Sequence, residues 1–218
     1  ISIKEKEYKY YKSKLSIFLL IFNLYLIFNS LISEFVVLSL ESSLFYFRFS
    51  FLIFSIWYLI EKYENFIKHF TNLFLITIIY VLIDAYFQFF TGYNFFGNPY
   101  VSNRLSGVFG DELILGSFLS RLFPLLFALL ILSKKNLNLI FAIVLLFLID
   151  ILVYLSGERL AFFNLLLFFV IIIVLIKKWN FIRLFSFIIS LIIISFISIN
   201  NHSVYDRMIS YTFNQVTK

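Results

Sequence analysis

The run FTNLFLITIIYVLIDAYFQFF, residues 70–90, decides the fold class of this chain. It holds one charged residue, and about 20 mainly apolar residues are enough for an α-helix to cross the core of a bilayer. Similar runs lie on both sides of it. With 62% hydrophobic residues, 14% charged residues and a mean hydropathy of +0.98, the chain has too little polar surface to cover a water-soluble domain. We therefore predict an all-α fold, a polytopic bundle of transmembrane helices.

About seven transmembrane helices are predicted. The first follows a lysine-rich head, but it is too long for a signal peptide and no small-residue cleavage site follows it. The chain starts at Ile1 and contains one methionine, Met208, so we expect residues 1–218 to be one transmembrane domain within a longer protein. The predicted spans cover residues 15–33, 43–60, 70–90, 112–133, 139–155, 160–176 and 184–199.

Lysine and arginine are distributed unevenly between alternate connections, with twelve on one side and four on the other. Cytoplasmic loops are enriched in these residues, which predicts a cytoplasmic N-terminus, an external C-terminus and an external loop at residues 91–111. Because the basic residues form short clusters between apolar runs, they indicate topology and a bilayer partner, and not nucleic acid. The twelve are Lys4, Lys6, Lys9, Lys12, Lys14, Lys62, Lys68, Lys134, Lys135, Lys177, Lys178 and Arg183; the four are Arg104, Arg159, Arg207 and Lys218.

The polar stretch NRLSGVFGDE, residues 103–112, interrupts this apolar pattern. Five of the six glycines and both prolines fall between residues 92 and 124. Glycine allows backbone conformations and close approaches that other residues resist. The stretch is therefore a candidate binding site on the external face, and an ordinary connecting loop is the alternative.

Ionisable side chains inside predicted helices form a second candidate site. Asp84, Arg121 and Asp150 each lie roughly 10–13 Å below the external end of their helices, given the rise of an α-helix. Charges within a bilayer are costly unless they are paired or hydrated. We predict that the three form one intramembrane cluster, which serves either an architectural or a functional role.

Arginines at the external face form the third candidate site, comprising Arg48, Arg104 and Arg159. Guanidinium groups bind phosphate oxygens in a bidentate manner and remain charged. The three would suit an anionic lipid head group and would stabilise a diphosphate leaving group. Gly107 and Gly110 would let the backbone approach bound phosphates. Arg48 has the alternative of extending to the interface without a ligand.

No metal or cofactor site is predicted. The chain has no cysteine, and the predicted topology places His69 and His202 on opposite sides of the membrane. Asp111 and Glu112 are adjacent acids that would suit a cation, but acids at a helix start also complement the helix dipole. We favour the helix-dipole interpretation.

Two segments resemble the bacterial O-antigen ligase and polymerase family of membrane glycosyltransferases. The first is RLSGVFGDELILGSFLSRLFPLL, residues 104–126, and the second is LSGERLAFFNLLL, residues 155–167. Members of that family have an external arginine, a Gly-Phe pattern and a helix that opens with polar residues, followed later by a Ser/Gly/Arg turn. The two segments occur here in the same order, and the resemblance covers roughly residues 70–217.

The resemblance implies a function in lipopolysaccharide biosynthesis at the external face of the bacterial inner (cytoplasmic) membrane. A glycan would move from an undecaprenyl diphosphate carrier to lipid A–core sugar or to another glycan acceptor, without a metal. Carried over by position, the arginines that contact the diphosphate would be Arg104 and Arg159. Glu112 and Glu158 are candidates to orient those arginines or to contact the sugar.

The chain departs from the family pattern near its end. The family histidine lies in a large external loop, and residues 200–218 would be the start of that loop. His202 lies too close to the predicted membrane exit to match it, so the histidine is expected beyond residue 218. Two other classes remain open: a transporter or flippase for a lipid-linked or anionic solute, with Asp84, Arg121 and Asp150 as its relay, and a non-catalytic membrane subunit.

Overall fold

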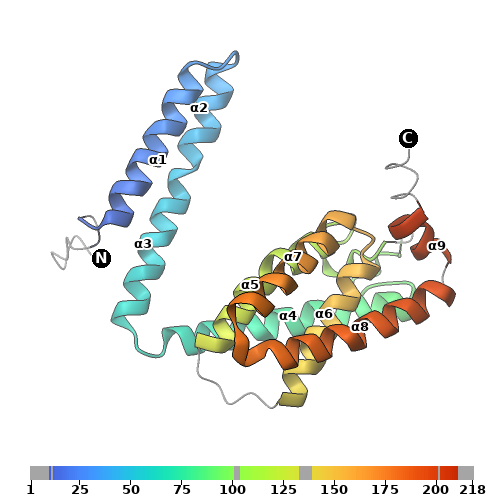
Figure 1. The fold of residues 1–218 in the computed structure, drawn as a ribbon. Coiled ribbons are helices and arrows are strands. Elements are labelled where there is room, and N and C mark those ends of the chain that lie inside the picture. Colours follow the sequence, from blue (N-terminus) through green and yellow to red (C-terminus); the bar gives the residue numbers. More distant parts are fainter. Residues whose placement is uncertain (1–9, 11, 101–103, 133–138, 201, 211–218) are drawn as a thin grey trace. The chain divides into compact units, whose positions relative to one another are not determined.

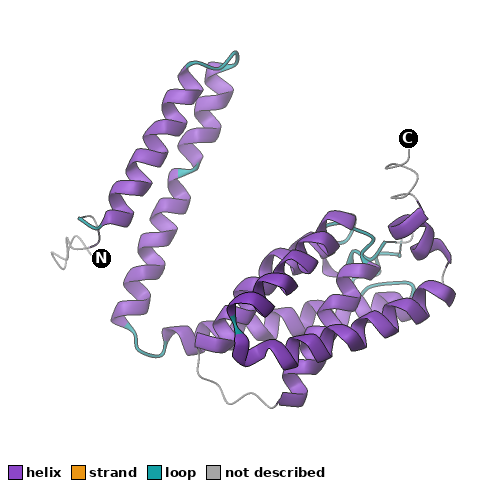
Figure 2. Cartoon of the chain, in the orientation of Figure 1, coloured by secondary structure: helices purple, strands orange, loops and turns teal. Residues whose placement is uncertain are grey.

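The computed structural model describes residues 10, 12–100, 104–132, 139–200 and 202–210, and regular structure in this part is helical (Figure 2). The all-α class is confirmed, whereas the number of spans and their orientation stay predictions. By length and composition, five described helices could cross a membrane: Lys14–Leu31, Val36–Lys62, Phe66–Thr91, Leu115–Leu132 and Asn180–Asn200. Shorter apolar helices occur at Ile140–Leu155 and Arg159–Leu175. The chain divides into two compact units, residues 1–67 and 68–218.

The first unit contains α1 (Lys14–Leu31), α2 (Val36–Phe45) and α3 (Phe47–Lys62), and α1 packs on α2 (Figure 1). The predicted second span began at residue 43, but its helical structure begins at Val36. At Tyr46 the N–H group donates to the oxygen of Ser43 at 3.2 Å, three residues back, which marks the break between α2 and α3.

Polar side chains join the helices of the first unit. Asn23 donates from Nδ2 to the hydroxyl of Ser50 at 2.8 Å, and Ser30 donates to the backbone oxygen of Ser39 at 3.1 Å. Lipid tails are as apolar as leucine, so helix contacts in a bilayer depend on close packing and on hydrogen bonds between helices. These serines and the asparagine serve that purpose between α1 and the α2–α3 segment.

The second unit is built around four packed helices, α5 (Leu115–Leu132), α6 (Leu139–Leu155), α7 (Arg159–Leu175) and α8 (Asn180–Asn200). The most extensive packing in this unit joins α6 to α8 and α5 to α7. Leucine, isoleucine and phenylalanine fill the space between these helices. Buried members of this core include Leu119, Phe123, Leu126, Leu146, Ile149, Leu152, Leu165, Ile172 and Phe187.

The ends of several helices meet at one end of the second unit. Here α4 (Phe66–Thr91) leads into the long loop, which contains a bridge between Tyr93 and Pro99 and a short 3-10 helix, Gly107–Phe109. The loop leads to α5, and the tight α6–α7 turn lies at the same end. After α8 come α9 (His202–Tyr205) and a π-helical turn, Asp206–Ser210. The candidate site lies where these segments converge.

Candidate functional site

The tight turn between α6 and α7 consists of Ser156, Gly157 and Glu158. Gly157 has a φ of 70°, in the left-handed region where a side chain is strained. A Cβ atom there would lie 2.9 Å from Cδ and Nε of Arg207 and 3.2 Å from Cγ of Arg104. Glycine is therefore required twice, for its backbone angle and because two arginine side chains lie against it.

Arg104 joins the long loop to this turn. Its Nε donates to the backbone oxygen of Ser156 at 3.2 Å, and its Nη2 donates to that of Leu113 at 2.8 Å. These bonds use two of the five N–H groups of the guanidinium. The same Nη2 lies 3.8 Å from Oε1 of Glu158, a distance that favours attraction between the charges without a direct hydrogen bond. Arg104 is thus held in place while retaining donors for a ligand.

Glu158 caps a helix other than its own. Its Oε1 accepts the N–H of Gly116 at 2.9 Å, and its Oε2 accepts both the N–H and the hydroxyl of Ser117, so the carboxylate lies at the N-terminus of α5. A negative charge at this position complements the helix dipole. The close approach also depends on Gly116, where a Cβ would lie only 2.2 Å from Oγ of Ser156. These N–H groups are consequently occupied by Glu158.

Arg207 brings a second cation to the turn from the segment after α8. Its Nε donates to the backbone oxygen of Gly157 at 3.1 Å. Burial lowers the pKa of the Arg104 guanidinium, the charge of Arg207 lowers it further, and the carboxylate of Glu158 opposes both effects. Two mutually repelling guanidinium groups therefore lie at the same turn, and the carboxylate that attracts Arg104 itself serves as a helix cap.

Tyr100 supplies a further polar group whose electrostatics are influenced by Arg207. Burial raises the pKa of its phenol, and the charge of Arg207 opposes that rise, so the hydroxyl remains a neutral donor at physiological pH. The Oη atom is buried and makes no hydrogen bond within the described part of the chain.

A buried amide network holds the long loop on α4. Oε1 of Gln88 accepts the N–H groups of Ser106 at 3.0 Å and of Gly107 at 2.8 Å. Nδ2 of Asn94 donates to the oxygen of Gly107 at 2.6 Å. Gln88 is fully buried and Asn94 is 3% exposed, so these bonds form out of contact with solvent and define the path of the loop toward Arg104.

The predicted intramembrane cluster does not form. Asp84 is fully buried, and its Oδ1 accepts the backbone N–H of Phe95 at 2.8 Å, so it fastens the loop to α4. Asp150 pairs with Arg183, whose Nη1 and Nη2 lie 2.6 and 3.0 Å from its two carboxylate oxygens. Arg121 is exposed on α5. Three residues at similar depth need not share one helix interface, because depth does not determine which face of each helix they occupy.

The charge pattern predicts that Arg183 lies in a cytoplasmic loop. The loop assignment is wrong, because Arg183 is a buried residue of a helix. Its side chain is 0% exposed within α8, and its guanidinium carbon lies 5.0 Å from the ring centre of Phe123, 5.4 Å from that of Phe169 and 5.5 Å from that of Phe187. The aromatic faces and the bidentate carboxylate of Asp150 compensate the buried charge. The pair joins α6 to α8.

The predicted loop glycines have packing roles in the structure. At Gly107, with a φ of 53°, a Cβ would lie 3.3 Å from Cβ of Ala85 and 3.4 Å from Oδ2 of Asp84, so the close approach is to α4. At Gly110, with a φ of 61°, a Cβ would lie 3.1 Å from Nδ2 of Asn98. Both positions therefore have structural reasons for glycine that are independent of a bound phosphate.

The remaining predicted residues are exposed, in the long loop, at the start of α7 and in the first unit. Asp111 and Glu112 are exposed in the loop, because α5 begins three residues later than predicted. Arg159 is exposed as the first residue of α7, and its approach to Arg104 stays a prediction. Arg48 belongs to the first unit, where it is exposed and its guanidinium carbon lies 4.8 Å from the ring centre of Phe49.

Arg207 and Tyr100 were not singled out by sequence reasoning. The sequence signal for Arg207 was the same as for Arg104 and Arg159. Each is an arginine on the predicted external side, where the positive-inside trend predicts few basic residues. Tyr100 carried no comparable sign, since tyrosine is frequent in this chain. No group of three or more His, Cys, Asp or Glu residues that could hold a metal occurs among the described residues.

No protein-family model, curated protein or solved structure matches this chain. The resemblance to O-antigen ligases therefore stays a prediction.

Proposed function

We propose that this chain binds the diphosphate of a lipid carrier at the external face of a bacterial inner membrane and acts as an O-antigen ligase-like glycosyltransferase. The observation that carries this proposal is the contact of Arg104 and Arg207 with Gly157. The two guanidinium groups concentrate positive charge where loops and helix ends meet. Phosphate oxygens match both the charge and the planar donor geometry of arginine.

The residues of the site have separate roles in the proposed reaction. The bond between the sugar's anomeric carbon and the diphosphate oxygen breaks, an acceptor hydroxyl forms the new bond to that carbon, and its proton is released to water. Negative charge grows on the departing diphosphate, where Arg104 and Arg207 would stabilise it. Glu158 is a positioning residue, because it holds the N-terminus of α5 beside Arg104. Arg159 would extend the cationic surface along the start of α7.

The external location rests on the charge bias of the connections. Removing the buried Arg183 from the count leaves eleven basic residues on the predicted cytoplasmic side and four on the other. Arg104, Arg159 and Arg207 all belong to the smaller group. This arrangement suits a reaction on carrier-linked glycans outside the cytoplasm, with lipid A–core sugar or another glycan as the acceptor.

The transporter alternative has less support than the transferase. It relies on a relay of Asp84, Arg121 and Asp150, and these residues lie in three different environments. The Asp150–Arg183 pair is bidentate and enclosed by aromatic rings, as expected for a link between helices.

Binding of inorganic diphosphate and of undecaprenyl diphosphate to the full chain in lipid nanodiscs tests the proposal. We expect Arg104→Gln and Arg207→Gln each to weaken binding about tenfold or more, because hydrogen bonds to charged groups contribute about 1.5–3 kcal/mol. Arg121→Gln is the matched control, an exposed arginine of the same unit, and should bind as the unchanged chain does. Undiminished binding by both site variants, at normal folded yield, would remove the diphosphate role.

A second measurement tests the transfer itself. Glycan appearing on the acceptor is followed in bacterial cells that lack their own ligase and express the chain or its variants. Transfer that depends on Arg104 and Arg207 supports the enzyme. Diphosphate binding without any transfer would retain the anion site and reject the catalytic function.

A further inference from the structure

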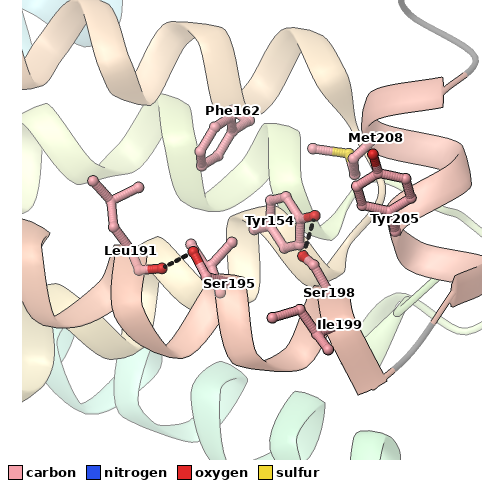
Figure 3. A pocket seen from close by; sticks show the side chains of 9 residues that line it. Tyr154, Phe162, Leu191, Ser195, Ser198, Ile199, Tyr205 and Met208 are labelled. Atoms are coloured by element: carbon pink, nitrogen blue, oxygen red, sulfur yellow. Dashed lines mark hydrogen bonds between the residues drawn. The ribbon is translucent and has the colours of Figure 1, made fainter.

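An apolar pocket lies beside the arginine site, between α6, α7, α8 and the segment after α8 (Figure 3). Its volume is about 590 Å³. Tyr154 of α6, Phe162 of α7 and Ile194 of α8 form one part of the wall, and Tyr205 and Met208 form the other. Pockets of this size and composition are typical of sites for organic ligands.

Three of the four hydroxyl groups in the pocket wall, those of Tyr154, Ser195 and Ser198, form hydrogen bonds within the wall; the fourth belongs to Tyr205. The hydroxyl groups of Tyr154 and Ser198 are 2.7 Å apart, and Ser195 donates to the backbone oxygen of Leu191 at 2.8 Å (Figure 3). The wall therefore suits hydrocarbon better than a polar ligand. Leu191 is 40% exposed and Ile199 is 72% exposed, so the pocket opens on the apolar surface of α8, from which a chain could enter out of the bilayer.

Two backbone segments connect this pocket to the arginine site. Tyr154 lies three residues before Gly157 on α6. In the segment after α8, Tyr205 and Met208 line the pocket, while Arg207 between them donates to the backbone oxygen of Gly157. The same short segment thus contacts the hydrocarbon space with two side chains and the cationic site with a third.

We infer that this pocket binds a hydrocarbon chain of the lipid whose phosphates lie at Arg104 and Arg207, and that its occupancy positions Arg207. The inference rests on the proposed function, under which the bound hydrocarbon is the prenyl chain of the lipid carrier. The neighbouring cations favour an occupant with an anionic head, and the exposed apolar opening favours one that arrives from the bilayer. A filled pocket supports Tyr205 and Met208 and thereby holds Arg207 over the Gly157 turn.

Three probes separate the parts of this inference: farnesyl diphosphate, farnesol and inorganic diphosphate, each added to the full chain in nanodiscs. Ser195→Phe fills the pocket from its exposed side without removing a bond between helices. Ser55→Phe is the matched control, since Ser55 is also exposed and donates to its own helix, to the oxygen of Phe51 at 2.8 Å. Leu191→Trp is a second filling variant in case the first fails to fold.

Farnesyl diphosphate should bind the unchanged chain more tightly than inorganic diphosphate does. We expect Ser195→Phe to weaken farnesyl diphosphate binding about tenfold or more, because several methylene groups lose their apolar site, while Ser55→Phe leaves it unchanged. Photolabelling by farnesyl diphosphate with a diazirine in its chain should reach Tyr205 or Met208. Normal binding by both filling variants, or labels confined to other surfaces, would overturn the pocket assignment.

Positive coupling is expected between the two halves of the ligand. Farnesol should raise the affinity for inorganic diphosphate several-fold in the unchanged chain and not in Ser195→Phe, since coupling between two sites is reciprocal. An affinity that does not respond to farnesol would overturn the positioning of Arg207. Glycan transfer that survives the filling variants would reject the pocket assignment while keeping the proposed function. Binding that depends on the prenyl chain, without any glycan transfer, would keep the pocket assignment and reject the transferase function.

Discussion

The two units of this chain bury different kinds of side chain between their helices. In the 1–67 unit most buried positions of α1, α2 and α3 are serine or asparagine: Ser16, Leu19, Asn23, Ser30, Ser43 and Ser50. In the 68–218 unit α5 alone buries nine residues, most of them leucine or phenylalanine. The first pattern allows close contact between a few helices, whereas the second makes a core thick enough to enclose an ion pair.

This difference explains where the candidate site lies. Charged side chains can be held in fixed positions only where surrounding structure supplies partners and excludes competing water or lipid. In the 68–218 unit, Asp150 and Arg183 are enclosed within the core, and Arg104, Arg207 and Glu158 converge at its end. The described part of the 1–67 unit shows hydrogen-bonded serines at its helix contacts and no comparable convergence of arginines.

The largest expected effect is on the buried ion pair. Arg183→Leu leaves the carboxylate of Asp150 buried without its partner and should lower the free energy of unfolding by about 3–5 kcal/mol. Adding Asp150→Leu should recover most of that loss. SDS-induced unfolding in mixed micelles measures both, with the exposed Arg121→Leu as control. A small effect of Arg183→Leu would contradict the proposed difference between the two units, because the buried ion pair would then contribute little to the stability of the 68–218 unit.

The next effect concerns the turn that the two arginines contact. Gly157→Ala combines an unfavourable positive φ, costing about 1–2 kcal/mol, with displacement of Arg207. Gly92→Ala is the matched control, since Gly92 has a φ of 83° and a Cβ added there would meet open space within 4 Å. Both should lower the stability, and Gly157→Ala should also weaken diphosphate binding. If the two variants bind diphosphate equally well, the Gly157 turn contributes to the fold of this unit but not to the binding site.

A smaller effect is expected at the helix cap shared between α5 and the α6–α7 turn. Glu158→Gln keeps the shape of the side chain but removes its charge from the helix N-terminus and from Arg104. The free energy of unfolding should fall by about 0.3–2 kcal/mol, measured by the same unfolding titration. Glu112→Gln, on an exposed carboxylate of the long loop, should change it little. If the two changes are equivalent, the cap does not contribute to the stability of the unit.

The smallest effect is expected in the 1–67 unit. Asn23→Leu removes the hydrogen bond to Ser50 between α1 and α3, and such bonds contribute about 0.6 kcal/mol on average within membranes. Asn29→Leu, on an exposed position of α1, is the control for added hydrophobicity. Unfolding of each variant in mixed micelles gives the comparison. A loss as large as that for Arg183→Leu would show that the two units depend equally on their polar contacts.

Sequence patterns anticipated the helices better than the partners of their charges. The described apolar helices lie close to the predicted runs, although α2 begins seven residues before its predicted span and α5 three residues after. Arg104 and Glu158 were recognised as site candidates, and the structure brings both to the α6–α7 turn. Arg207 was counted only as a tail residue, and Arg183 only as a topology signal, because neither local spacing nor composition reveals a contact between distant helices.

The sequence by itself determined that the chain forms apolar helices, since long hydrophobic runs can satisfy their backbone hydrogen bonds in lipid only as helices or closed barrels. It also placed glycine where the loop and the tight turn needed it. Only the tertiary structure decided that Asp150 meets Arg183, that Glu158 caps α5, and that Arg207 lies with Arg104 against Gly157. Helix rotation and packing determine which side chains face each other, and many sequences of equal hydropathy allow different rotations.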